Sequence, residues 1–141
     1  MSVVVVRGAV AVVEGPGRVR TGDVVLVDGM VVEAADTTDA EIIDATGCVV
    51  TPGLVNAHHH LLQTAFRTLP GTRGIPMREW LPAMAGAYAE ARVDPELTGL
   101  AARAGLAEAL LSGVTTVADH HLTWPAEADG VGMARAAARA A

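Results

Sequence analysis

The sequence TPGLVNAHHH, at residues 51–60, decides the fold. Pro52 and Gly53 belong to the residue types that most strongly interrupt secondary structure, so they mark a boundary in the chain. Residues 54–58 then predict a short strand, and a run of three histidines stands at its carboxyl end. The patterns before and after Pro52 differ, which indicates that the chain changes architecture at this point.

Residues before this boundary predict a small β unit built of short strands and turns. Valine-rich runs at 3–6 and 24–27 favour strands, because β-branched side chains suit a pleated sheet. Asp28 and Gly29 separate two apolar runs and predict a hairpin with a type I′ turn, which needs positive φ at both central residues. We therefore expect a β-sandwich-like domain over residues 1–51.

After the boundary, over residues 52–141, predicted strands and helices alternate. A helical stretch over 77–92 contains Pro82, which we expect to divide it. A second helix begins after Asp94, a plausible N-cap, and a strand follows at 114–118. The apolar face of the second helix is expected at Leu97, Leu100, Ala104, Ala107 and Leu111, which recur at helical spacing.

Strand, helix and strand in this order are typical of parallel βαβ architecture. The predicted fold class is therefore α/β, with the β-sandwich-like unit followed by the first βα units of a TIM-type (β/α)8 barrel. A complete barrel takes roughly 250 residues. The barrel is expected to be incomplete, because the chain has 141 residues in all.

Composition narrows the classes of function. Hydrophobic residues make up 51% of the chain and charged residues 18%. This balance predicts a folded core. The net charge of −6 argues against nucleic acid as a partner, since phosphate binding needs clustered basic side chains. No apolar run approaches the roughly 18 residues that a membrane helix needs. With Cys48 as the single cysteine and no signal-peptide pattern, we expect a cytoplasmic protein without a disulfide.

All five histidines fall at the carboxyl ends of the two predicted barrel strands, at 58–60 and 120–121. Functional sites of parallel α/β folds form at these ends. Side chains alternate along a strand, so His58 and His60 are expected to share a face and His59 to point away. Two neutral imidazoles on one face can bind one zinc or iron ion. The alternative reading is a polar strand end that binds no metal.

The wider context resembles a known family. Residues 44–61 closely resemble the signature of the amidohydrolase superfamily, an Asp-Ala-x-Gly segment followed by Pro-Gly, two hydrophobic residues, Asn or Asp, one variable residue, and His-x-His. Residues 112–119 are also similar to this family. The runs at 58–64 and 119–121 resemble the cytosine-deaminase and triazine-hydrolase branch, including 8-oxoguanine deaminases and hydroxyatrazine aminohydrolases.

This resemblance implies a metal-dependent hydrolase that acts on carbon–nitrogen bonds other than peptide bonds. The implied reaction is hydrolytic deamination of an aminated heterocycle, a small molecule, by metal-bound hydroxide. The implied cofactor is one divalent metal ion, zinc or else iron, with His58 and His60 as ligands. Further ligands and the acid–base residues have no counterpart in the chain and are expected downstream. The chain is therefore expected to be an N-terminal fragment, inactive alone, of a homo-oligomeric enzyme.

Three further residues are candidates for substrate binding. The Gln63 amide could read the donor–acceptor edge of a heterocycle, although a solvated loop side chain is the alternative. His120 and His121 could contact substrate, or they could only hydrogen-bond the rim of the barrel. A different hypothesis for the whole chain is a non-catalytic metal-binding or interaction module.

Overall fold

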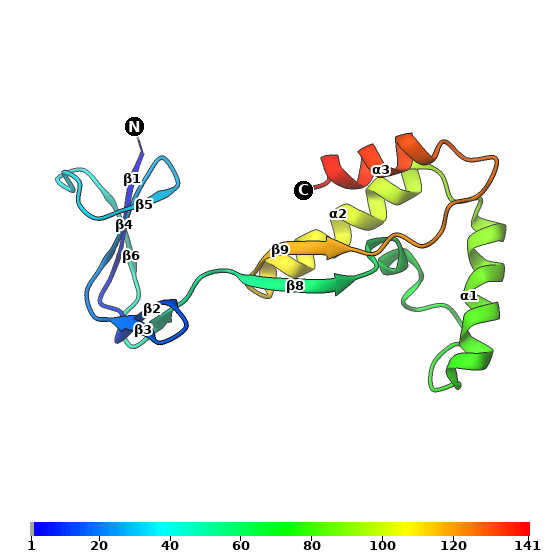
Figure 1. Ribbon diagram of the computed structural model, residues 1–141, viewed down its shortest axis with the longest axis horizontal. Helices are drawn as coiled ribbons and strands as arrows, with labels where there is room; N and C mark the ends of the chain where they lie inside the picture. Colours follow the sequence, from blue (N-terminus) through cyan, green and yellow to red (C-terminus); the bar gives the residue numbers. More distant parts are fainter. Residues whose placement is uncertain (1) are drawn as a thin grey trace. The chain divides into compact units, whose positions relative to one another are not determined.

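The valine-rich N-terminal part forms two small sheets in the computed structural model, which describes residues 2–141 (Figure 1). One sheet has the order β5 (Met30–Val32), β4 (Val24–Val27), β1 (Val3–Arg7) and β6 (Glu41–Asp44). The other has the order β3 (Arg18–Arg20), β2 (Ala11–Gly15) and β7 (Val49–Val50). This part of the chain is a compact unit that extends to Pro52, and its packing as a β-sandwich stays a prediction.

The predicted hairpin is confirmed between β4 and β5. These strands pair antiparallel with Val27 opposite Met30, which leaves Asp28 and Gly29 as the turn. The φ angles are 48° at Asp28 and 81° at Gly29. Both central residues therefore have the positive φ that a type I′ turn requires.

The second compact unit, Gly53–Ala141, is mixed α/β. Its elements are β8 (Leu54–His59), the 3-10 helix η1 (Leu61–Phe66), α1 (Met77–Ala91), α2 (Pro95–Leu111), β9 (Val114–Asp119) and α3 (Gly130–Arg139). Strands β8 and β9 lie side by side and pair parallel, which confirms the predicted pairing of 54–58 with 114–118 (Figure 1). Within residues 2–141, no helix combines the length and apolar character that crossing a membrane requires.

Helix α1 is continuous through Pro82, so the expected division of this stretch is wrong. A proline inside a helix removes one backbone donor, here the bond to the Arg78 carbonyl. One missing bond near the first turns is tolerated while the rest of the helix keeps its hydrogen bonds. Helix α2 begins as predicted, because the Asp94 carboxylate accepts a hydrogen bond from the Leu97 N–H at 2.8 Å. Such a bond satisfies one of the N–H groups that have no partner inside the helix.

The apolar face expected for α2 is largely wrong. Leu100 is 52% exposed and Leu111 is 90% exposed, while Leu97 does pack against the core. The buried residues of α2 are instead Thr98, Gly99, Ala101, Ala102 and Gly105. The leucine spacing therefore did not identify the packed side of this helix.

Close packing explains why small residues form the buried side of α2. A Cβ atom on Gly105 would lie 2.7 Å from Thr64 Oγ1 and 3.0 Å from Leu61 Cδ2, both on η1. A Cβ atom on Gly99 would lie 3.4 Å from the Cβ of Ala136 on α3. Helix α2 thus approaches both neighbours at distances that larger side chains would prevent.

The pair Gly105 and Gly86 tests this packing. Gly105→Ala should lower the free energy of unfolding by about 1 kcal/mol, because overpacking against η1 costs more than the helix gains from alanine. Nothing lies within 4 Å of a Cβ added to Gly86 in α1. Gly86→Ala should therefore raise the free energy of unfolding by about 0.5–1 kcal/mol. Urea unfolding measures both, and an equal gain from the two variants would contradict the close approach of α2 and η1.

Candidate metal centre

Parallel pairing of β8 and β9 brings the two histidine clusters together. His59 lies opposite Asp119 in the register, and the His120 N–H donates to the His59 carbonyl at 2.7 Å. The segments 58–60 and 119–121, about 60 residues apart in sequence, thus end side by side at the carboxyl edge of this sheet.

His58 and His60 share one side of the strand end, as predicted. Their Nε2 atoms are 3.3 Å apart, with the rings perpendicular and the ring centroids 5.0 Å apart. The Nδ1 atom of His60 faces the carbonyl oxygen of His120 at 2.5 Å. Since a carbonyl only accepts, this Nδ1 carries the proton when the ring is neutral, and the Nε2 of His60 is then a lone pair. The Nδ1 atom of His59 is buried without a partner among residues 2–141.

The chemistry of this pair fits a divalent cation. Two imidazole nitrogens bound to one tetrahedral zinc ion, each at about 2.0–2.1 Å, lie about 3.3 Å apart. The Nε2 atoms of His58 and His60 have this separation, 3.3 Å. Across residues 2–141, no group of three or more His, Cys, Asp or Glu side chains is placed to hold a metal ion. The pair therefore offers two ligands, and a complete site would need more.

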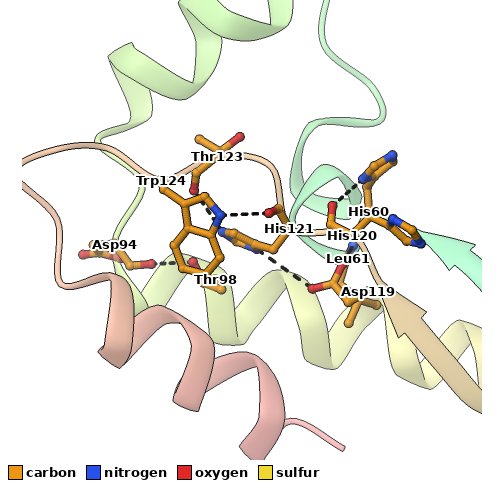
Figure 2. A network of polar contacts seen from close by, with 9 residues as sticks. All are labelled: His60, Leu61, Asp94, Thr98, Asp119, His120, His121, Thr123 and Trp124. Atoms are coloured by element: carbon orange, nitrogen blue, oxygen red, sulfur yellow. Dashed lines mark hydrogen bonds and ion pairs between the residues drawn. The ribbon is translucent and has the colours of Figure 1, made fainter.

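His120 and His121 occupy different environments. The His120 ring is exposed, stacks on His58 with centroids 4.5 Å apart, and its Nε2 faces the Ala57 carbonyl at 3.3 Å. The His121 side chain is only 10% exposed. Its Nε2 donates to the Thr123 carbonyl at 3.0 Å, and its ring packs on Trp124 (Figure 2). His120 therefore faces the imidazole pair, and His121 lies in the packed layer behind it.

Gln63 lies beside the same cluster. A cavity of about 10 Å³ is lined by His60, Gln63, Tyr88, Asp119, His120 and His121, among others. This volume is on the order of one water molecule. The structure thus brings the three candidate substrate-binding residues to one cavity with His60.

Asp119 received no role from the sequence and is a central polar residue of this region. Its Oδ1 accepts a hydrogen bond from the Leu61 N–H at 2.9 Å, and its Oδ2 lies 3.9 Å from the Nδ1 of His121 (Figure 2). The Asp119 side chain is 19% exposed. In the sequence, this role was indicated only by the position of Asp119, directly before two histidines at the end of a strand. A carboxylate at that position faces either the end of the neighbouring strand or the helices.

Comparisons with known proteins agree with the motifs. The Amidohydrolase family profile matches residues 49–141. An 8-oxoguanine deaminase of Pseudomonas aeruginosa is 38% identical over 126 residues, covering 85% of this chain and 28% of that protein. An isoxanthopterin deaminase of an unknown prokaryotic organism is 36% identical over 130 residues, covering 84% of this chain and 27% of that protein.

Solved structures give the same result. A mutant atrazine chlorohydrolase of Arthrobacter aurescens TC1, complexed with zinc and atraton, superposes with a TM-score of 0.79 at 33% identity. The match covers 97% of this chain and 32% of that one. The chain therefore spans about a third or less of the length of the proteins that it matches.

The fold and this strand edge define a mixed α/β protein whose candidate functional side chains stand at the carboxyl ends of parallel strands. The chain belongs to the amidohydrolase family, as its motifs indicated, and the relatives above are named as deaminases and hydrolases.

Tyr88 borders the cavity and has an unusual environment. Its hydroxyl is buried without a hydrogen-bond partner among residues 2–141, and its ring packs edge-on against Phe66 with centroids 4.8 Å apart. Burial raises the pKa of Tyr88, and the Gln63 side chain opposes this with a smaller effect. Desolvation thus extends the neutral form of the phenol to higher pH.

Tyr88→Phe should leave the free energy of unfolding at pH 7 unchanged or higher, because it removes a buried polar group that is unpaired. The raised pKa of Tyr88 also predicts that the wild-type chain loses stability as pH rises past 10.0. The reason is that tyrosine ionises first in the unfolded state. The Tyr88→Phe variant contains no tyrosine, so its free energy of unfolding should fall less over the same rise in pH. Thermal unfolding at pH 7 and pH 11 measures both. A loss above about 1 kcal/mol at pH 7 would mean that the hydroxyl is paired.

Proposed function

We propose that this chain carries part of the active site of a metal-dependent hydrolase that deaminates an aminated heterocycle. The observation that carries the proposal is the 3.3 Å approach of the Nε2 atoms of His58 and His60 at the carboxyl end of a parallel strand. Membership in the amidohydrolase family and the deaminase names of its relatives support the reaction class.

The proposed fold is the beginning of a TIM-type (β/α)8 barrel over residues 52–141, preceded by a β-sandwich-like domain over 1–51. Parallel pairing of β8 and β9 with α1 and α2 between them supports the barrel, since such crossovers are its building unit. The superposition on a zinc-containing hydrolase, over 97% of this chain and 32% of that one, supports it further.

His58 and His60 would bind one divalent cation, zinc or else iron, through their Nε2 atoms. The cation, when bound, would act as a Lewis acid that lowers the pKa of water at the site. The His60 Nδ1–H donates to the His120 carbonyl, which holds the ring and keeps its Nε2 free of a proton. The chain thereby presents one ligand in the required tautomer before any cation arrives.

Gln63, His120 and His121 are the proposed substrate-binding residues. The Gln63 amide offers a donor and an acceptor to a heterocycle edge, and it lies at the same cavity as His60. The exposed His120 ring, stacked on His58, is placed to contact a molecule at the imidazole pair. His121 is the most enclosed of the three, and its contribution would pass through its contact with Asp119. The acid–base residues and the remaining ligands would come from chain outside these 141 residues, in a homo-oligomeric enzyme.

Ammonia release tests this function. The purified 141-residue chain, supplied with zinc or iron, should show negligible turnover of aminated purines, pyrimidines and triazines. Catalytic zinc sites use three protein ligands, and this chain presents two. A longer polypeptide that contains this sequence should release ammonia from one of these classes. His58→Ala should abolish that activity, and His59→Asn should retain most of it.

Three results would contradict the proposal. Steady turnover by the 141-residue chain that disappears in His58→Ala would show that the chain completes its own site. The deaminase assignment would be wrong if a metal-loaded longer polypeptide released no ammonia from any of the three substrate classes. The ligand assignment would be wrong if His59→Asn lost as much activity as His58→Ala.

A further inference from the structure

The end of β9 holds His60 from two sides. On one side the His120 carbonyl accepts from the His60 Nδ1. On the other, the Asp119 carboxylate accepts from the N–H of Leu61, the next residue in the chain, at 2.9 Å. Two consecutive residues at the end of one strand therefore fix both the ring and the backbone of a candidate ligand on the neighbouring strand (Figure 2).

His60 needs such support because it lies outside regular structure. Strand β8 ends at His59, and η1 begins at Leu61. His60 is the N-cap of η1 with φ −125° and ψ 83°, and its own side chain makes no capping hydrogen bond. The first N–H groups of a helix lack partners within the helix, so the cap has to come from elsewhere. The carboxylate of Asp119 supplies it across the strand pair.

The second oxygen of the Asp119 carboxylate lies beside a packed ring. This oxygen lies 3.9 Å from the Nδ1 of His121, whose side chain is 10% exposed. The other ring nitrogen of His121 donates to the Thr123 carbonyl, and the Trp124 Nε1–H donates to the His121 carbonyl at 2.9 Å. Trp124 also packs on the His121 ring, with centroids 4.4 Å apart. The carboxylate is therefore backed by a packed layer rather than by mobile solvent.

We propose that Asp119 is a positioning residue for the metal centre, which holds the backbone after His60 so that the His60 Nε2 converges with that of His58. The inference rests on the proposed function, since it assigns a role toward the cation that His58 and His60 would bind. The His121 ring, held by Thr123 and Trp124, packs beside the carboxylate and limits its movement.

A purely structural role for the same carboxylate predicts something different. If Asp119 acted only as a helix cap, it would stabilise η1, the helix that contains the buried residues Leu61 and Leu62. Its removal would then lower the melting temperature and leave the zinc affinity of the folded chain unchanged. Asp94 is the matched control, because its carboxylate accepts from the Leu97 N–H at 2.8 Å and lies away from the imidazole pair, at the start of α2.

The experiment is a zinc titration of the 141-residue chain by calorimetry, with each variant shown by circular dichroism to be folded. The wild-type chain, with two ligands, should bind zinc weakly, and His58→Ala should abolish this binding. Asp119→Ala should raise the zinc Kd by about 10–100-fold, the usual effect of removing the support of a ligand. Asp119→Asn should raise it less, because the amide oxygen can still accept from Leu61. Asp94→Ala should lower the melting temperature and leave the zinc Kd within about twofold of wild type, because a lost N-cap affects its own helix.

The outcomes separate the two proposals. Zinc affinity that depends on His58 but is unchanged in Asp119→Ala and Asp119→Asn would overturn the positioning role alone. Zinc affinity that does not depend on His58 would overturn the metal centre itself. If Asp119→Ala does not fold, Asp119→Leu, which keeps the size of the side chain and has no acceptor for the Leu61 N–H, decides the question, together with ¹⁵N NMR of the histidine rings. A wild-type zinc Kd and a wild-type His60 tautomer in folded Asp119→Leu would then overturn the positioning role, whereas a weaker Kd would support it.

Discussion

The parallel pairing of β8 and β9 is the constraint on which the rest of the second unit depends. It is fixed at both ends, by Leu54 N–H to the Gly113 carbonyl at 2.9 Å and by His120 N–H to the His59 carbonyl at 2.7 Å. The start of the pair also requires glycine at position 53, because a Cβ there would overlap the Thr115 side chain. The Pro-Gly step before the histidines is thus a packing requirement of the sheet as well as a boundary.

Local sequence rules predicted the elements that depend on local physics. The Asp28–Gly29 turn and the Asp94 cap are set by backbone preferences and by one side-chain hydrogen bond, so short sequence windows suffice for them. The alternation of side chains along β8 likewise predicted that His58 and His60 share a face. The parallel pairing of β8 with β9 followed from strand–helix alternation, since such crossovers place successive strands side by side.

Features that depend on neighbouring elements were not predictable in the same way. The packed side of α2 is decided by how closely η1 and α3 approach this helix. The close approach occurs at Gly99 and Gly105, and the leucine spacing does not indicate it. The contact between Asp119 and the Leu61 N–H joins residues that are 58 positions apart. Sequence spacing indicated the histidine pair, but only the register of two strands reveals which carboxylate supports it.

Backbone carbonyls face one ring nitrogen in each of three histidines of the cluster. His60 faces the His120 carbonyl, His120 faces the Ala57 carbonyl, and His121 faces the Thr123 carbonyl. In a neutral imidazole, each such contact holds an N–H on one ring nitrogen and leaves the other nitrogen as a lone pair. The Ala57 carbonyl belongs to β8 and the His120 carbonyl directly follows β9, so the strand pair positions the acceptors that select the tautomers of His60 and His120. A cation that approached His60 would meet a lone pair whose direction is already fixed, and this preorganisation reduces the entropic cost of binding.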